Sequence, residues 1–169
     1  MANTTVAKIR AMLSDEKHLH MTNMDFSGLD LSGFDFSGMT IASTNFSNCA
    51  LKKSKFVKTF LANCNFQKSD LSNADFSGAN LKEADFCFCN LENAQFSQAN
   101  MGKAKLVQAR CKKASMSFAS MSGCDLSKAD LSEVSFHGAD LSKANFTSAN
   151  TRGAHFKNTK LDGATGYKG

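Results

Sequence analysis

An apolar residue recurs at every fifth position from Phe26 to Leu161, with Thr151 as the one exception, and this period is the feature that most constrains the fold. The recurring residue is mostly Phe or Leu, and a small residue, most often Ala, precedes it by two positions. A period of five belongs neither to an α-helix, with its 3.6 residues per turn, nor to a β-strand, with its period of two. A repeat this regular predicts a solenoid in which each repeat packs on its neighbours.

Each five-residue unit can be read as a short side followed by a corner. The central apolar residue and the small residue two positions earlier are expected to point inward, with the outward position between them facing solvent. The two corner positions that follow are rich in Ser, Gly, Asn and Lys, and Gly and Asn suit tight turns. Stacked coils would pair their backbones at about 4.8 Å. The absence of proline fits, because proline lacks the donor that this pairing needs.

The alternation of Phe and Leu decides how many sides a coil has. Phe and Leu alternate with a period of ten, so like residues stack only if the number of sides is even. Three sides would place Phe over Leu in every layer, whereas four sides give uniform columns. The sequence therefore predicts an all-β solenoid, a four-sided parallel β-helix of about seven coils. The expected core columns contain Phe26, Phe46, Phe66 and Phe86; Phe36, Phe56, Phe76 and Phe96; and Leu31, Leu51, Leu71 and Leu91.

The repeated motif resembles that of a known family. Residues 22–163 follow Ala-[Asp/Asn]-[Leu/Phe]-x-x, as in Ala-Asn-Leu-Lys-Glu at 79–83, and so resemble the pentapeptide repeat family. The resemblance implies a right-handed quadrilateral β-helix. It implies little about function, because one fold can serve unrelated roles. Some members of the family protect DNA gyrase from quinolones by presenting acidic rows that mimic duplex DNA.

The two ends of the repeat region are expected to differ. Val6, Ile9 and Leu13 have helical spacing, which predicts a short N-terminal helix that caps the first coil. Beyond Leu161 too few residues follow to cover the last coil, so an open end is expected, suited to a homodimer or a docking partner. The expected organisation is a capping helix and lead-in at 1–21, the β-helix at 22–163 and a short tail at 164–169.

Neither the cysteines nor the histidines suggest a metal or catalytic site. Five of the six cysteines are expected to point inward as reduced, buried thiols, namely Cys49, Cys64, Cys89, Cys111 and Cys124. His137 and His155 fall on adjacent coils without a third ligand. The pattern contains no catalytic triad order, no phosphate-binding loop and no insertion that could form a pocket. We therefore expect no enzyme activity, no cofactor and no bound metal.

The charge of the chain disfavours two classes of function. There are 20 Lys and Arg residues against 15 Asp and Glu, a net charge of +5. A DNA mimic needs a negative field, and a nucleic-acid-binding protein needs a strongly basic face. Direct nucleic-acid binding is therefore not expected. A candidate basic surface lies in the fifth coil, with ordinary solubilising charge as the alternative; it contains Lys103, Lys105, Arg110, Lys112 and Lys113.

Apolar residues at outward-facing positions are the candidate partner contact. Cys87 and Phe88 occupy one corner, and Val107 lies 20 residues after Cys87, so the three are expected to form an exposed patch. Phe60 and Phe118 should also face outward, on other sides of the rod. Single exposed apolar residues are ordinary, and a cluster is more informative.

The leading hypothesis is a non-enzymatic protein-interaction scaffold, an adaptor or effector whose sides or open end bind a protein. The alternative is a DNA-mimicking protein that binds DNA gyrase or topoisomerase and confers fluoroquinolone resistance or toxin immunity. A third hypothesis, an enzyme or metal protein, lacks a site. No apolar run reaches the roughly 20 residues of a membrane span, and the N-terminus lacks an apolar signal core. A cytoplasmic location is expected, with leaderless secretion as the other route.

Overall fold

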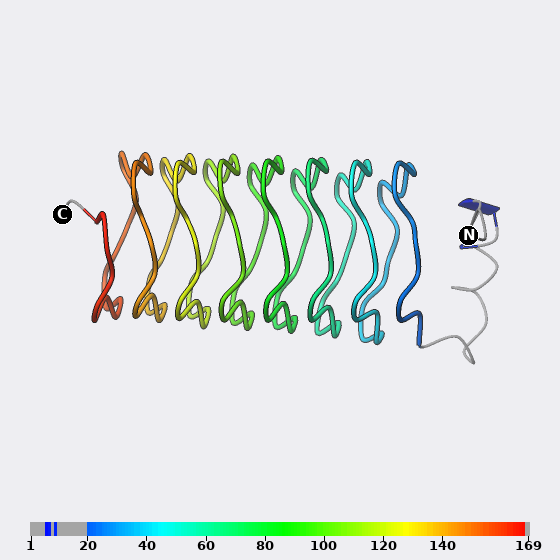
Figure 1. Cartoon of the computed structure of the whole chain (residues 1–169), viewed down its shortest axis with the longest axis horizontal. Coiled ribbons are helices and arrows are strands. Elements are labelled where there is room, and N and C mark those ends of the chain that lie inside the picture. The colour runs from blue at the N-terminus through cyan, green and yellow to red at the C-terminus, as the bar shows by residue number, and fades with distance from the viewer. Residues whose placement is uncertain (1–5, 8, 10–19, 168–169) are drawn as a thin grey trace.

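The computed structural model describes residues 6–7, 9 and 20–167, and residues 20–165 form a rod of stacked coils (Figure 1). The strands are single bridge residues, one in every five from His20 to Thr165. Each bridge is parallel and joins residues 20 positions apart, from His20–Thr40 to Asn145–Thr165. With a corner every five residues, each coil has four sides, which confirms the predicted parallel, four-sided solenoid. We number the coils 1 to 7, as residues 22–41, 42–61, 62–81, 82–101, 102–121, 122–141 and 142–161.

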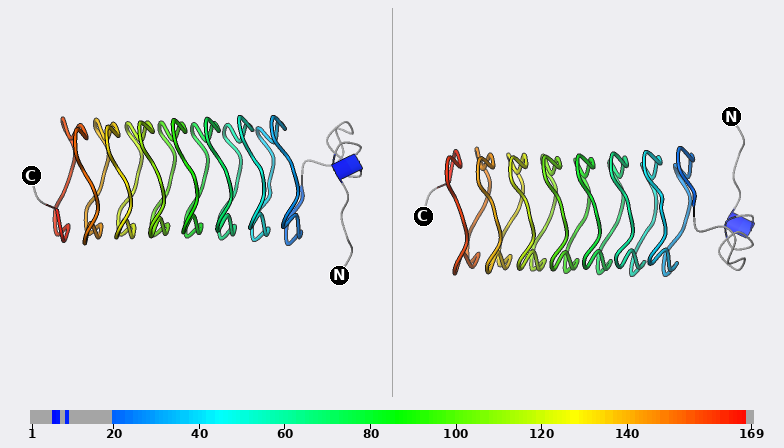
Figure 2. Two further views of the ribbon diagram at one scale, coloured as in Figure 1. Left: turned by 90° about the horizontal axis from the view of Figure 1, so that it is seen from above. Right: turned by 90° about the horizontal axis from the view of Figure 1, so that it is seen from below.

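Backbone hydrogen bonds between coils hold the rod together. In the unit of Phe66, the N–H groups of Phe66 and Lys68 donate to carbonyl oxygens of the next coil, at 2.8 and 3.1 Å. The N–H of Asn65 donates to a carbonyl of the preceding coil at 3.0 Å. The N–H of Ser69 donates to the carbonyl of Phe66 at 3.1 Å and closes the corner. The pattern recurs along the stack, and the coils stay in register when viewed from above and below (Figure 2).

The second corner position is left-handed at the corners throughout the stack. Its φ is 75° at Gly28, 59° at Asn63 and 62° at Lys68. Positive φ at this position, with a hydrogen bond from the fourth residue to the first, is typical of a type II turn. Gly and Asn adopt this conformation readily, whereas it costs other residues about 1–2 kcal/mol. The inter-coil bonds of the turn hold Lys68 and its equivalents in place despite that cost.

The core consists of two ladders of phenylalanine rings on opposite sides. Phe66 stacks on Phe46 and Phe86 with ring centroids 4.9 Å apart and nearly parallel planes. It meets Phe56 and Phe76 of the opposite ladder edge-on, at 5.9 and 5.8 Å. Offset-stacked and edge-to-face contacts are both favourable for aromatic rings. All the predicted core residues, from Phe26 to Phe96 and from Leu31 to Leu91, are fully buried.

Part of the cover at each end of the rod lies within the described residues. Val6, Ala7 and Ile9 are helical and Ile9 is buried, while Leu13 and the rest of the predicted capping helix lie outside the described residues. At the C-terminal end the Tyr167 ring lies 4.9 Å from that of Phe156. The tail therefore covers part of the last coil, which its short length did not suggest. Leu161 remains partly exposed there.

Replacement of a ladder phenylalanine should destabilise the protein strongly. We expect Phe66→Ala to lower the free energy of unfolding by about 3–5 kcal/mol, because it leaves a cavity between four other rings. Phe88→Ala is the matched control, since it removes the same atoms from an exposed corner and should change stability by less than about 1 kcal/mol. Guanidinium unfolding followed by circular dichroism measures both. Equal losses for the two variants would contradict the described core.

Candidate protein-interaction surface

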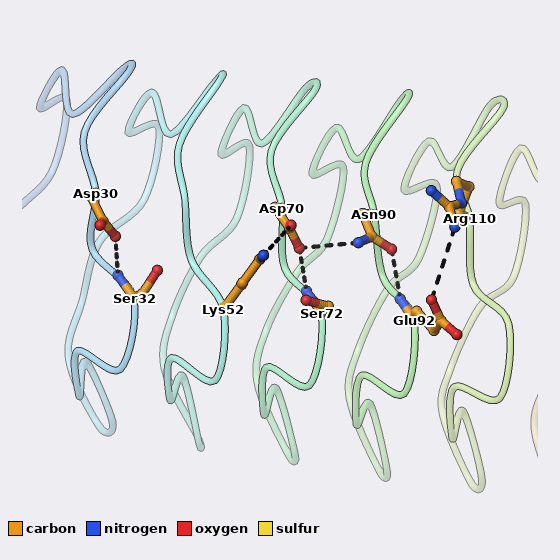
Figure 3. A network of polar contacts seen from close by, with 8 residues as sticks. All are labelled: Asp30, Ser32, Lys52, Asp70, Ser72, Asn90, Glu92 and Arg110. Carbon is orange, nitrogen blue, oxygen red and sulfur yellow. Dashed lines mark hydrogen bonds and ion pairs between the residues drawn. The ribbon is translucent and has the colours of Figure 1, made fainter.

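The Asp and Asn side chains at the outward positions accept hydrogen bonds from the backbone of the corner that follows them. Coil-to-coil and turn bonds use four of the five N–H groups in a unit and leave that of the first corner residue. The outward carboxylate or amide accepts it, as Asp30 Oδ1 does from Ser32 N at 3.0 Å and Asp70 Oδ1 from Ser72 N at 3.1 Å (Figure 3). Asn90 Nδ2 also donates to Asp70 Oδ1, at 3.1 Å. These Asp and Asn side chains therefore complete the hydrogen bonding of their own corners and link adjacent coils.

The same bonds tune the acidity of the rows. The backbone N–H of Ser32 holds the pKa of Asp30 below its usual value of 3.8. The Ser142 side chain, and then its backbone N–H, do the same for the pKa of Asp140. Hydrogen bonds to the ionised form favour ionisation. These carboxylates are therefore charged at neutral pH and held by donors of their own chain.

Charge is arranged in bands around the rod and not in rows along it. Each coil takes its charges from one run of 20 residues, so a cluster in the sequence becomes a band. Coils 1 and 6 are mainly acidic, while coils 2, 5 and 7 contain only basic charges among their Lys, Arg, Asp and Glu residues. The bands alternate along the axis with the weakly acidic coils 3 and 4. No side of the described coils is continuously acidic or continuously basic.

The candidate basic surface in coil 5 is split between two sides of the rod. Lys103 and Lys105 lie on one side, whereas Arg110 lies on the following side and Lys112 and Lys113 form the corner at its end. These last three residues form ion pairs with neighbouring coils. Arg110 lies 3.9 Å from Glu92, and Lys112 and Lys113 each lie 3.7 Å from Glu133. Exposed pairs of this length contribute little to stability.

Coil 5 also departs from the motif at its outward positions. Lys105 and Arg110 stand where most other coils have Asp or Asn, so within the described chain no side chain accepts from the N–H of Val107 or Lys112. The lost hydrogen bond is worth about 0.5–1.5 kcal/mol at each position. Positions that break a local rule in a regular structure are candidates for function.

Three large aromatic residues are exposed: Phe60 at 42%, Phe88 at 50% and Phe118 at 58%. Phe88 and Phe118 occupy the second corner position, with φ of 63° and 58°, which is unusual for a bulky residue. Phe118 lies over Gly138, where an added Cβ would be 2.7 Å from its ring, and meets the His137 ring edge-on at 5.1 Å. The two corners lie on opposite edges of the rod, so they form separate surfaces.

The predicted exposed patch is only partly exposed. Cys87 was expected on the surface, but this is wrong, because only 8% of the residue is accessible. The first corner position is overlaid by the same position of the adjacent coils, and Val107 there is half-buried. Burial raises the pKa of the Cys87 thiol to about 11. Phe88 is therefore the accessible part of this patch, with Val107 beside it.

The other residues singled out for chemistry do not form a site. The five inward cysteines are buried and free, as predicted, and the thiol of Cys89 donates to a backbone carbonyl at 2.8 Å. Among the described residues no three His, Cys, Asp or Glu side chains are placed to hold a metal ion. In the same part of the chain no helix is long and apolar enough to cross a membrane.

Comparison with known proteins agrees with this architecture. A family model described as Pentapeptide repeats matches in eight copies, at residues 20–56, 44–82, 79–110, 109–147 and 139–165. No curated protein sequence matches the chain. The solved structure of HetL, a pentapeptide repeat protein involved in heterocyst differentiation regulation in the cyanobacterium Nostoc, is similar with a TM-score of 0.57 and 22% identity, over 95% of this chain and 96% of HetL.

A second similar structure is trypsin-treated QnrB1, a plasmid-mediated fluoroquinolone resistance protein. Its TM-score is 0.61 at 22% identity, over 86% of this chain and 74% of QnrB1. Pentapeptide repeat proteins form right-handed quadrilateral β-helices. At this level of identity both similarities concern the fold alone.

The lowered pKa values predict a loss of stability in acid. A carboxyl group whose pKa is lower in the folded state than in the unfolded state stabilises the folded protein at any pH above its unfolded-state pKa. This stabilisation is lost as the pH falls through the folded-state pKa. We expect the free energy of unfolding to be level above about pH 5 and to fall below about pH 4. The double variant Asp30→Asn and Asp140→Asn keeps the hydrogen bonds without the titration, so its urea-unfolding profile should be flatter. A wild-type profile that stays level to about pH 2 would contradict this account.

Proposed function

Because the chain belongs to the pentapeptide repeat family, we propose that it is a non-enzymatic protein-interaction scaffold with an adaptor-like or effector-like role. Pentapeptide repeat proteins are generally non-enzymatic scaffolds. The observation that carries the proposal is the pair of exposed, left-handed phenylalanines, Phe88 and Phe118. A corner needs no side chain there, as Gly78 and Gly138 show, so a large aromatic adds strain and exposed apolar area without improving the coil.

Phe88 with Val107 is the first proposed partner contact, and the buried Cys87 precedes Phe88 in the same corner. Phe118 is the second, since its corner carries no charged residue between Lys58 and Lys157. Aromatic residues in polar surroundings are typical centres of protein interfaces. The basic residues around Arg110 would add charge complementarity beside Phe88.

The partly exposed C-terminal end supports a further contact. Phe156 and Leu161 are half-buried there, and within the described chain the N–H groups of both make no backbone hydrogen bond. A homodimer through this end stays a prediction. A cytoplasmic location is also part of the proposal, because six free cysteines suit a reducing compartment.

Matched baits test the scaffold proposal. We expect affinity capture with wild-type protein to retain a protein that the Phe118→Asn or the Phe88→Asn bait loses at least about tenfold. Asn is compatible with the left-handed corner, since Asn48 and Asn63 adopt this conformation elsewhere in the rod, so each variant should fold. Circular dichroism and the unfolding midpoint confirm the fold of each bait. Identical captured proteins and yields for all three baits would contradict the proposal.

DNA gyrase binding is the alternative, favoured by family membership and by the fold shared with QnrB1. The alternating charge bands count against it, because a duplex mimic presents one sign of charge along its length. We therefore expect purified protein at micromolar concentration neither to inhibit gyrase supercoiling nor to rescue it from a fluoroquinolone. Inhibition or rescue that is lost when Asp25, Asp30 and Asp35 of coil 1 are changed to Asn would establish the alternative instead.

A further inference from the structure

We propose that the side of the rod bordered by Phe88 binds a second copy of this chain in antiparallel orientation. This side, the Phe88 side, comprises the outward row that runs from Asp30 to Asn150 in steps of 20 residues, together with the corners that bound it. Figure 3 shows Asp30, Asp70, Asn90 and Arg110 of this row. The inference rests on the proposed role of the exposed phenylalanines as contact sites. It goes further by naming what covers one of them.

The position of Phe88 along the rod suggests the symmetry. Phe88 lies in coil 4, the middle coil of seven. A two-fold axis through coil 4, perpendicular to the rod and within the contact, reverses the order of the coils and places each row against itself. Coil 1 then faces coil 7, coil 2 faces coil 6 and coil 3 faces coil 5. Phe88 packs against Phe88 of the second copy, which would bury the most accessible apolar group of this side.

The charges of the outward row become complementary under this operation. Asp70 of coil 3 comes opposite Arg110 of coil 5, and the symmetry forms this pair twice, on either side of Phe88. Both side chains are accessible, and among the described residues each has one ion-pair partner: Lys52 lies 3.3 Å from Asp70, and Glu92 lies 3.9 Å from Arg110. A carboxylate can accept further bonds, and a guanidinium has five donors. The new pairs therefore add to the existing contacts.

The corner that follows the row is complementary as well. Lys53 of coil 2 comes opposite Glu133 of coil 6, with Asp130 in the adjacent outward row. Within the described chain neither Lys53 nor Asp130 forms an ion pair, so both have charge to offer a partner. At the other edge, Lys68 and Lys128 come opposite uncharged residues. Glu92 is the one charged residue of this side that meets its own copy, and Arg110 of the same chain lies beside it.

In the outward rows of the other three sides the same operation places no Lys or Arg opposite an Asp or Glu. On the side after the Phe118 corner it places Phe60 opposite Asp140. On the side before Phe88 it brings Asp85 against its own copy at the axis. On the remaining side it sets Lys55 opposite Ser135, an uncharged residue. The opposed pair of Asp70 and Arg110 is thus specific to the Phe88 side and is not a general property of the fold.

The size of the contact predicts a weak dimer. Seven coils at about 4.8 Å and a side of about 16 Å give roughly 500 Å² per partner, below the roughly 800 Å² of a standard interface. Charge pairs at its centre also make it sensitive to salt. We expect a dimer with a dissociation constant in the micromolar range that weakens about tenfold or more between about 50 and 500 mM salt.

Substitution of Arg110 distinguishes an effect on the dimer contact from an effect on the stability of the fold. Arg110→Asn would return the motif residue, whose Oδ1 can accept the unpaired N–H of Lys112. The variant should be more resistant to unfolding than the wild type and yet bind its second copy at least about tenfold more weakly. Ser120→Asn is the matched control in the same coil, because it adds the same kind of bond on another side. It should gain stability and keep the wild-type dissociation constant.

Sedimentation equilibrium of the full chain is the test. We expect the wild type, Phe118→Asn and Ser120→Asn to form dimers at about 100 µM in low salt, and Phe88→Asn and Arg110→Asn to be mainly monomeric. Asp70→Arg and Arg110→Asp should each be monomeric alone and form a heterodimer when mixed, because both opposed pairs are then restored. Circular dichroism verifies that each variant is folded.

Two outcomes would overturn the inference. One is a monomeric wild type at that concentration in low salt. The other is a dimer that survives Phe88→Asn and Arg110→Asn, which would point to a contact elsewhere, such as the C-terminal end. Neither outcome touches the scaffold proposal, because the Phe118→Asn bait tests that role on the opposite corner.

Discussion

The hydrogen bond between successive coils is the interaction on which the rest of the structure depends. It joins residues 19 or 21 positions apart, so every coil must contain 20 residues and every corner must turn in two. The left-handed second corner position makes such a turn, even where the residue is Lys, Gln or Phe. The strain of these corners, about 1–2 kcal/mol each, is sustained because each corner is bonded to the next coil. A single inserted residue would break the register of all that follows.

Register also explains why the surface looks as it does. Rows repeat every 20 residues, so the Phe centres become ring ladders, and outward Asp and Asn residues become rows that complete the bonding of the units that contain them. The same register turns a basic stretch of sequence into a band around one coil. The long-range electrostatic field is therefore divided along the axis, and a partner would have to match the order of the bands.

The positions that break the motif are the ones with a prospect of function. Phe88 and Phe118 add strain and exposed apolar area where glycine would serve. Lys105 and Arg110 forgo a hydrogen bond that Asp or Asn would make. A regular scaffold makes such departures visible, because each can be compared with many equivalent positions in the same molecule. Stability given up at a few points in this way is common at functional sites.

The period of five, the lack of proline and the alternation of Phe and Leu determined the four-sided coil and its core without reference to a structure. They could do so because every five-residue unit packs against equivalent units in the adjacent coils. The residue type at each position of the motif therefore indicates whether that position is buried or exposed. The burial of Cys87 was decided only by the tertiary structure, since it depends on the side chains one coil above and below. The packing of Tyr167 on Phe156 lies outside the repeat and followed no pattern. The ion pairs of Arg110 with Glu92 and of Lys52 with Asp70 were likewise decided by the tertiary structure. Each pair joins residues about one coil apart, whose side chains meet only when the coils are stacked.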